Sequence, residues 1–253
     1  MLPKEFKPKE NYDLIRIGSD NDGGYLVDPV SITNSKYLIS FGLGFDWTFE
    51  KDFLKKAKCK LYGFDIQIRK YFWFKNLIRN LEKFLLRKIK YTKLKKEILN
   101  NLECRKLLNN SNIYIFQKAI AQNNSSSNLS SIIKEFSIEK NFFLKIDIEG
   151  AEYKILDDIK NYQHLISGLV IEFHDVDLNR DMIKKFINSL ETLKLIHIHP
   201  NNAGGLCENG DPKLIEMTFS ANPIIIDSEV EFPHYLDQKN TEKKNDLIMA
   251  FET

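Results

Sequence analysis

The chain has 253 residues, of which 43% are hydrophobic, and its formal net charge is +2. This composition indicates an ordinary globular protein that can bury a full core as one domain. No apolar run reaches the roughly 18 residues of a membrane span, and the start MLPKEFKPKENYD lacks the apolar middle of a signal peptide, so we expect a cytoplasmic protein. The three cysteines are odd in number, far apart and outside any CxxC pair, which argues against a disulfide framework and a structural zinc site.

Strand patterns and helical patterns alternate along the chain. The strand patterns occupy residues 36–42, 59–65, 112–120, 142–147, 168–173 and 193–199, and the helical patterns occupy residues 46–57, 128–136, 152–162 and 180–193. This alternation predicts an α/β fold in which helices cover both faces of a mostly parallel sheet. Two more apolar runs, 214–220 and 245–252, follow with no helical pattern between them, so we expect an antiparallel C-terminal edge.

Residues 66–110 form a basic segment with 13 Lys and Arg against three Glu. Apolar residues at helical spacing predict one or two amphipathic helices, inserted into a single domain that spans residues 1–253. These apolar residues are Leu77, Leu81, Phe84, Leu85 and Ile89. Two interpretations stay open: the lysines are simply solvated, or the segment meets a phosphate-bearing substrate or an anionic membrane surface. No nucleic-acid-binding motif accompanies the charge, so we expect no nucleic-acid partner.

The ends of the first two predicted strands favour a nucleoside cofactor. Gly42 and Gly44 allow a tight turn after the first strand, and Asp65 ends the second, where such folds place an acid that accepts the ribose hydroxyls of an adenosine. A dinucleotide site would need a third glycine, but FDW follows Gly44, and its acid would repel a pyrophosphate. The pattern therefore favours S-adenosylmethionine, which carries a sulfonium and an ammonium group.

Three carboxylates follow the strand at 142–147 within six residues. We expect Asp147, at the strand tip, to face the amino acid end of the cofactor or the reacting hydroxyl of the substrate. Glu149 and Glu152 surround the start of the next predicted helix, and the position of Glu152 is typical of a residue that caps the helix or interacts with its dipole.

The segment FFLKIDIEGAEYKIL, residues 142–156, resembles the hallmark segment of the FkbM-type S-adenosylmethionine-dependent methyltransferases. Three more segments resemble matching parts of a bacterial branch of that family: RIGSDNDGGYLV (16–27), YLISFGLGFDWTFEKDF (37–53) and HIHPNNAGG (197–205). The resemblance spans most of the chain and is weakest over residues 66–110. It implies a Rossmann-like class I methyltransferase fold with a seven-stranded sheet. It also implies methyl transfer to an oxygen, commonly on a sugar or glycan.

The resemblance implies where the ligands bind. It places cofactor contacts at Gly42, Gly44 and Asp65, and we extend this set to Ser40, Ile66 and Asp147. The substrate contacts that we predict are Asp22, Gly23, Tyr25, Glu149, Asn201 and Asn202.

Methylation of a hydroxyl needs a base near the acceptor, because an alcohol is a poor nucleophile until its proton is being removed. Glu172 and His174 lie at the end of the strand at 168–173, and His199 ends the strand at 193–199. With Asp147 they are the catalytic candidates. His197 shares a strand face with His199 but lies further from the tip, which favours a structural role. Asp147, Glu172 and His174 could also converge on Mg²⁺, which is the minority interpretation.

We therefore expect an O-methyltransferase that acts on a sugar hydroxyl for a surface glycan such as capsule or lipopolysaccharide. The sugar would be nucleotide-activated or already bound to the polysaccharide, and the basic segment would meet the diphosphate. Two alternatives stay open. One is a nicotinamide-dependent oxidoreductase, disfavoured by the absent third glycine, and the other is a noncatalytic protein that binds a membrane surface or a glycan.

Overall fold

The structure is a computed structural model that describes residues 1–68, 72–120, 127–227 and 229–252. Residues 69–71 of the predicted basic segment lie outside the described residues.

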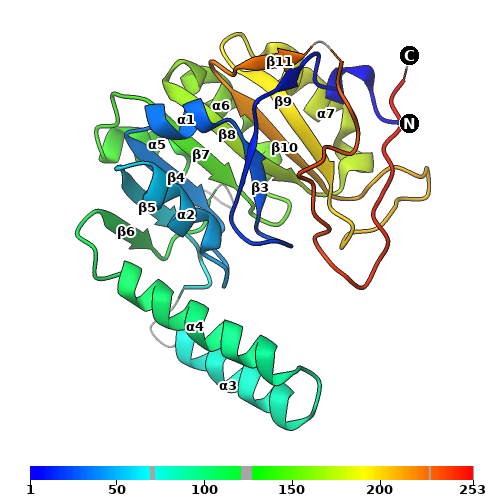
Figure 1. Ribbon diagram of the computed structural model, residues 1–253. Coiled ribbons are helices and arrows are strands. Elements are labelled where there is room, and N and C mark those ends of the chain that lie inside the picture. The colour runs from blue at the N-terminus through cyan, green and yellow to red at the C-terminus, as the bar shows by residue number, and fades with distance from the viewer. Residues whose placement is uncertain (69–71, 121–126, 228, 253) are drawn as a thin grey trace.

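A seven-stranded sheet forms the centre of the molecule (Figure 1). In spatial order its strands are β6 (Ile113–Phe116), β5 (Lys60–Phe64), β4 (Tyr37–Phe41), β7 (Phe142–Ile146), β8 (Ile166–Phe173), β10 (Ile215–Ser220) and β9 (Lys194–Pro200). Each of the six predicted strand patterns overlaps one of these strands. The order reverses between β4 and β7, so the carboxyl ends of these two strands flank the crevice in which such sheets bind ligands.

The predicted antiparallel strand is β10, which runs antiparallel to β8 on one side and to β9 on the other. It lies between these two strands, and β9 forms the edge of the sheet. The second C-terminal run, 245–252, was wrongly predicted as a strand. It makes only a bridge, Leu2 to Phe251, because the N-terminal residues and not a sheet edge supply its hydrogen-bond partners.

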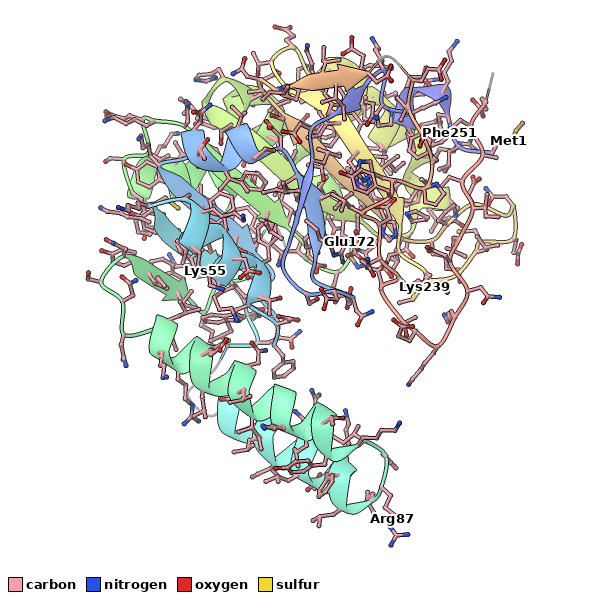
Figure 2. The ribbon with its side chains drawn as sticks, viewed as in Figure 1. Met1, Lys55, Arg87, Glu172, Lys239 and Phe251 are labelled. Carbon is pink, nitrogen blue, oxygen red and sulfur yellow. The ribbon has the colours of Figure 1, made fainter. Side chains whose placement is uncertain are left out.

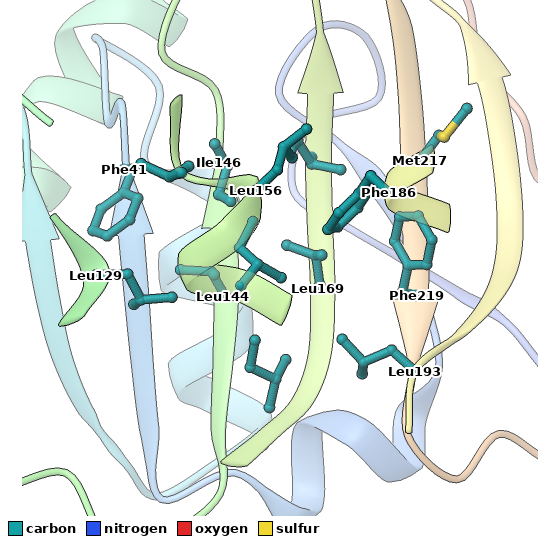
Figure 3. Packing of buried hydrophobic residues seen from close by; sticks show 14 of the residues in the cluster. Phe41, Leu129, Leu144, Ile146, Leu156, Leu169, Phe186, Leu193, Met217 and Phe219 are labelled. Carbon is teal, nitrogen blue, oxygen red and sulfur yellow. The ribbon is translucent and has the colours of Figure 1, made fainter. Parts of the chain in front are cut away.

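Helices cover both faces of the sheet, as predicted. On one face, α5 (Leu129–Glu135), α6 (Leu156–Tyr162) and α7 (Val176–Ser189) bury aliphatic and aromatic side chains against the strands (Figure 3). On the other face, α1 (Pro29–Asn34) and α2 (Thr48–Lys56) pack beside a hairpin of β2 (Ile15–Ile17) and β3 (Tyr25–Val27). Short 3-10 turns, η1 (Lys4–Phe6), η2 (Glu152–Lys154) and η3 (Gln163–Leu165), and a strand pair of β1 (Asn11–Tyr12) with β11 (Ile225–Asp227), complete the described elements.

The face under the β2–β3 hairpin carries the polar residues of the sheet. Thr218 of β10 donates a hydrogen bond to the carbonyl oxygen of Leu26 at 2.8 Å, which holds the hairpin on the sheet. The loop between β2 and β3, residues 18–24, reaches the segment just before α2, where Gly23 lies beside Asp46. This loop is ordered by Arg16, whose guanidinium donates to the carbonyl oxygens of Ser19 and Asn21.

The basic segment forms two helices, α3 (Phe72–Leu85) and α4 (Tyr91–Leu107), as predicted. They lie side by side as an antiparallel hairpin that extends away from the sheet (Figure 1). Among the described residues, no helix is long and apolar enough to cross a bilayer.

Candidate active site

Polar side chains form a row across four neighbouring strands at the carboxyl edge of the parallel sheet. The register pairs Glu216 of β10 with Glu172 of β8 on one side and with His199 of β9 on the other. Lys145 of β7 pairs with Val170, so Asp147 and Glu172, each two residues further on, lie at about the same level. Alternate residues of a strand share a face, so all four side chains lie on the side of the β2–β3 hairpin. We call Asp147, Glu172 and Glu216 the carboxylate row; Glu172 is labelled in Figure 2.

A tight glycine turn after β4 lies at one end of this row. Gly42 has a φ of +76°, and a Cβ there would lie 1.6 Å from the backbone oxygen of Asp147. The amide of Gly42 donates to the carbonyl of Phe64, and the amide of Asp147 donates to the carbonyl of Phe41, both at 3.0 Å. Glycine at position 42 therefore allows the turn to pass directly against the end of β7.

Asp65 connects the glycine turn to the end of β5. Its Oδ2 accepts a hydrogen bond from the amide of Gly44 at 2.8 Å, and its Oδ1 accepts one from the amide of Gln67 at 2.6 Å. The turn and this carboxylate border a cavity between the ends of β4, β5, β6 and β7. Its lining comprises Gly42, Gly44, Phe64, Asp65, Ile66, Gln67, Lys118, Ala119, Ile120, Asp147, Ile148 and Glu149. Four of the predicted cofactor residues and the tip carboxylate Asp147 thus share one cavity.

Ser40 does not line this cavity, contrary to the prediction. It is fully buried and donates a hydrogen bond at 2.7 Å to Glu50, which is also fully buried. The ammonium of Lys145 lies 3.3 Å from the same carboxylate and donates to the carbonyl of Gly42. Burial alone would lower the pKa of Lys145, but the carboxylates of Glu50 and Asp147 raise it. The buried ammonium of Lys145 therefore holds the carbonyl of Gly42, and with it the glycine turn, in place.

The carboxylate row holds several acids that are difficult to ionise together. Burial raises the pKa of Asp147 to about 6, although Lys145 and His174 act in the opposite direction. Burial, together with the charges of Asp147 and Glu216, raises the pKa of Glu172 well above its ordinary value. Neighbouring carboxylates with little solvent favour the protonated form or a bound positive charge. The edge of the cavity is therefore suited to a cation such as a sulfonium.

His174 lies beside Asp147 and is held by two glutamates. Its Nδ1 is 3.1 Å from Oε1 of the buried Glu152, and its Nε2 is 3.4 Å from Oε2 of the exposed Glu149. Burial would lower the pKa of His174, but Glu152 and Asp147 outweigh it, and the pKa is raised. The imidazole can therefore hold a proton next to the cavity.

Glu152 does not act as the helix cap that its position suggested. Its Oε1 accepts hydrogen bonds from the amides of Ile148 and Gly150, at 3.1 and 3.2 Å, and makes no side-chain cap. Glu149 and Gly150 have φ values of +55° and +96°, so the chain after β7 turns sharply around this carboxylate. Glu152 orders the loop and orients His174.

Replacing Glu152 with Gln should lower the pKa of His174 in an NMR titration of its ring, because the nearest buried anion is lost. A raised pKa means that the fold favours the imidazolium. The imidazolium of His174 therefore stabilises the folded protein fully below the ordinary pKa of about 6.5. This contribution to stability is lost as the pH rises through the raised pKa. The variant should lose this pH dependence, whereas Glu149→Gln, at an exposed position, should keep most of it. An unchanged titration in Glu152→Gln would contradict the assignment.

His199 ends the row at the sheet edge. Its Nδ1 lies 3.3 Å from Oε2 of Glu216, and the buried Nε2 has no hydrogen-bond partner among the described residues. Glu216 also accepts a 2.6 Å hydrogen bond from Asn240, whose Nδ2 lies 3.4 Å from Asp22. His197, as predicted, is structural: its Nε2 lies 3.0 Å from the carboxylate of Asp237.

The two predicted asparagines have different roles. Asn201 is buried and donates a 3.0 Å hydrogen bond to Oε1 of Glu172, so it orients a member of the row. Asn202 is fully buried and donates to the carbonyl of Thr241, whose amide donates back to its side-chain oxygen. The amide of Asn202 holds the C-terminal segment, so the structure does not bring this residue to the row, and its contact with substrate stays a prediction.

The β2–β3 loop brings the remaining predicted substrate residues to the row. The residue Asp22 is exposed as a whole, but its carboxyl group faces Asn240 and the row, where loss of solvent and then the charge of Glu216 raise its pKa. Gly23 has a φ of +84° and lies beside Asp46. Tyr25 is only 2% exposed, and burial, with Asp147 and Glu172 as the next causes, raises its pKa well above the ordinary value. Tyr25 is thus buried next to the row.

The predicted metal ligands do not form one group. Among the described residues, ligand atoms lie within 4.8 Å of one another in two sets: Asp147, Glu149 and His174, and Asp22, Glu172 and Glu216. Glu172 is paired in register with Glu216 and belongs to the second set, whereas His174 belongs to the first. The Mg²⁺ interpretation therefore keeps only Asp147 and His174 of its original ligands, and metal binding itself stays a prediction.

Glu216, Asn240 and Lys145 are site residues that the sequence interpretation missed. A charged residue inside an apolar strand pattern was the available signal for Lys145 and Glu216, since a buried charge needs a partner. Asn240 lies in a segment with no periodic pattern, and nothing in its local sequence indicates its contact with Glu216.

Comparison with known proteins gives a family match over part of the chain. Residues 91–194 match the model described as "Methyltransferase FkbM domain". That range is less than half of the chain and includes Asp147, Glu149, Glu152, Glu172 and His174. The match confirms the predicted family resemblance over this part of the chain. A search of curated proteins found no match.

Solved structures give weak likenesses. An rRNA methylase from Streptococcus thermophilus has a TM-score of 0.40 and 12% identity, over 77% of this chain and 93% of that chain. SMU.1697c from Streptococcus mutans, solved in complex with SAH, has a TM-score of 0.38 and 16% identity, over 76% and 93%. The precorrin-6y C5,15-methyltransferase from Geobacter metallireducens has a TM-score of 0.38 and 7% identity, over 76% and 83%. At these scores no functional argument rests on them.

Proposed function

Because residues 91–194 match the FkbM methyltransferase domain, we propose that the chain transfers the methyl group of S-adenosylmethionine to a hydroxyl oxygen of a sugar. The observation that carries the proposal is the position of Asp147. This carboxylate lines the cavity behind the glycine turn, and it also lies within 4.8 Å of the ligand atoms of Glu149 and His174. One acid therefore belongs both to the cofactor cavity and to the row where an acceptor would lie.

The cavity would hold the cofactor in a defined orientation. The adenosine ribose would lie at Asp65, whose carboxylate oxygens keep lone pairs for its hydroxyls in addition to the two backbone amides. The sulfonium would lie towards Asp147 and Glu149, where negative charge is concentrated. The reacting methyl group would then point along the carboxylate row.

The row would bind and activate the acceptor. Carboxylates accept hydrogen bonds from sugar hydroxyls, and they repel anionic groups, so the sugar ring and not a phosphate would contact Glu172, Glu216 and Asp22. A diphosphate would have to extend towards the basic segment. Asp147 and His174 are the groups that could take the hydroxyl proton as the methyl group arrives, because both lie beside the cavity and both have a raised pKa. His199 would act through Glu216, as a positioning residue.

The alternatives make different predictions for ligand binding. S-adenosylhomocysteine should raise the melting temperature, and NAD should leave it unchanged, because only a ligand that prefers the native state stabilises it. Incubation with methyl-labelled cofactor and nucleotide sugars should give an alkali-stable methyl ether. Stabilisation by NAD alone would support an oxidoreductase, and no stabilisation by either would support a noncatalytic protein. The cytoplasmic location and the absence of a nucleic-acid partner stay predictions.

Replacing Asp65 with Ala should weaken the binding of S-adenosylhomocysteine by roughly 10- to 100-fold, since it removes a charged acceptor for the ribose. Calorimetry measures this affinity directly. Asp65→Asn is the matched control, because it keeps an oxygen for one backbone amide and should lose less affinity. Wild-type affinity in Asp65→Ala would remove the residue from the cofactor site.

A further inference from the structure

The tip of the α3–α4 hairpin exposes large apolar side chains. We call residues 85–91, the end of α3, the turn and the start of α4, the hairpin tip. Leu85 is 78% exposed, Leu86 is 65% exposed and Tyr91 is 64% exposed. These three exposed apolar residues lie within seven positions, at the end of the hairpin that is most distant from the sheet (Figure 1). Exposing apolar side chains to water is unfavourable in free energy, so a cluster of them on a protein surface marks a contact site.

Cationic side chains lie between these apolar ones. Arg87, Lys88 and Lys90 are all exposed, and the hairpin tip contains no acidic residue. Figure 2 shows Arg87 at the extreme end of the hairpin, with its side chain directed away from the body. The tip therefore combines apolar and positively charged groups on one small surface.

The conformation of Arg87 is unusual for its residue type. The amide of Lys88 donates to the carbonyl of Lys83, and the amide of Arg87 donates to that of Phe84, which is the hydrogen-bond pattern of a Schellman helix end. Arg87 occupies the left-handed position of this motif, with a φ of +54°, where glycine is the least strained residue. The chain thus places a guanidinium at a position that backbone preference alone would give to glycine.

The other end of the hairpin is attached beside the cofactor cavity. Cys104 of α4 is buried with Leu43 and Trp47, next to the glycine turn, and the side chain of Asn100 donates to the carbonyl of Phe45 at 3.2 Å. Lys51 of α2 forms an ion pair with Glu103. The hairpin is therefore anchored at its base and leaves the sheet from the carboxyl end of β5, while its tip stays exposed.

We propose that the hairpin tip docks on the surface of a bilayer that contains anionic phospholipids. Charge complementarity identifies the occupant: lysine and arginine attract anionic headgroups, and leucine and tyrosine beside them enter the boundary between headgroups and acyl chains. A soluble phosphate compound or a nucleic acid would use the cations but would gain nothing from exposed leucines. The docked hairpin would tether the domain to the membrane, with the carboxyl edge of the sheet about one hairpin length, roughly 20–25 Å, from the docked tip.

Co-sedimentation of the full chain with vesicles tests the proposal. The protein should bind vesicles of phosphatidylcholine with 30 mol% phosphatidylglycerol and should bind pure phosphatidylcholine at least roughly tenfold more weakly. Replacing Arg87, Lys88 and Lys90 with Glu should reduce binding at least roughly tenfold. Leu85→Ser with Leu86→Ser should also reduce it, with the melting temperature unchanged. In the charge-matched control, Glu replaces three exposed lysines on or near α5 and α6: Lys134, Lys140 and Lys160. This variant should bind vesicles as the wild type does.

Three outcomes would overturn the proposal. Equal binding by the charge-reversed variant and its control would mean that net charge alone drives the association. Unchanged binding by the two-serine variant would mean that no side chain enters the bilayer. Binding to inorganic polyphosphate or a short RNA duplex but not to vesicles, lost on charge reversal, would assign the tip to soluble polyanions.

Discussion

Replacing Asp147 with Asn should lower the turnover number by roughly 100-fold or more, the effect expected when a positioned acid-base or electrostatic group is lost. The substitution keeps the shape of the side chain and removes its charge from the edge of the cofactor cavity. Methyl transfer from labelled cofactor measures the rate. The charge-matched comparison is Asp181→Asn, at an exposed position of α7, which should lose much less activity. Equal rates in the two variants would show that Asp147 is not at the reacting centre.

The same substitution should make the folded protein more stable at neutral pH. Because the pKa of Asp147 is raised to about 6, the fold favours its protonated form, and stability falls as the pH rises from the ordinary value of 3.8 through 6. An uncharged Asn avoids this loss, which is on the order of 1–3 kcal/mol when its coupling to neighbouring acids is discounted. A slower but more stable variant is the pattern expected of a residue kept for function. Denaturant unfolding at pH 4 and pH 8 measures the difference.

Replacing Gly42 with Ala should abolish measurable binding of S-adenosylhomocysteine, a loss of roughly 100-fold or more. The new Cβ would lie 1.6 Å from the backbone oxygen of Asp147, so the glycine turn and the end of β7 would have to separate. This movement would displace both walls of the cavity. We also expect a lower melting temperature, because a residue with a side chain is strained in the left-handed region by about 1–2 kcal/mol.

Gly210→Ala separates the two effects. Gly210 has a φ of +84°, but a Cβ there would meet nothing within 4 Å, so this variant carries backbone strain without a collision. It should lose stability and keep its affinity for S-adenosylhomocysteine in calorimetry. Wild-type affinity in Gly42→Ala would contradict the position of the cavity.

Local patterns predicted most of the fold. The alternation of apolar runs and helical patterns depends on neighbouring residues, and so the six alternating strand patterns each overlap a strand and the basic segment contains two helices. The position of β10 between β8 and β9 depends on pairing between distant segments. The local periodicity of the sequence carries no information about such pairing. The run at 245–252 failed for the same reason: its apolar residues contact the N-terminal segment instead of a strand.

The sequence predicted those site residues that lie at the carboxyl ends of parallel strands. Asp147 and Glu172 were found because the rule that ligands bind at carboxyl ends directs attention to the last residues of each strand. Glu216 was missed because β10 is antiparallel, so its first residues, and not its last, lie at that edge. Asn201 and Asn202 are adjacent in sequence, and nothing local distinguishes them. Asn202 is hydrogen-bonded to Thr241, so only Asn201 reaches the row, where it donates to Glu172.

Proton release on cofactor binding tests the central claim, that Asp147 faces the sulfonium, most directly. Calorimetry at pH 6 in buffers of different ionisation enthalpy gives the number of protons released. S-adenosylmethionine should release protons, because its positive charge lowers the pKa of Asp147, whereas S-adenosylhomocysteine, which lacks the sulfonium charge, should release fewer. Asp147→Asn should abolish the difference between the two ligands. Equal proton release by both ligands in the wild type, or a difference that persists in Asp147→Asn, would contradict the account.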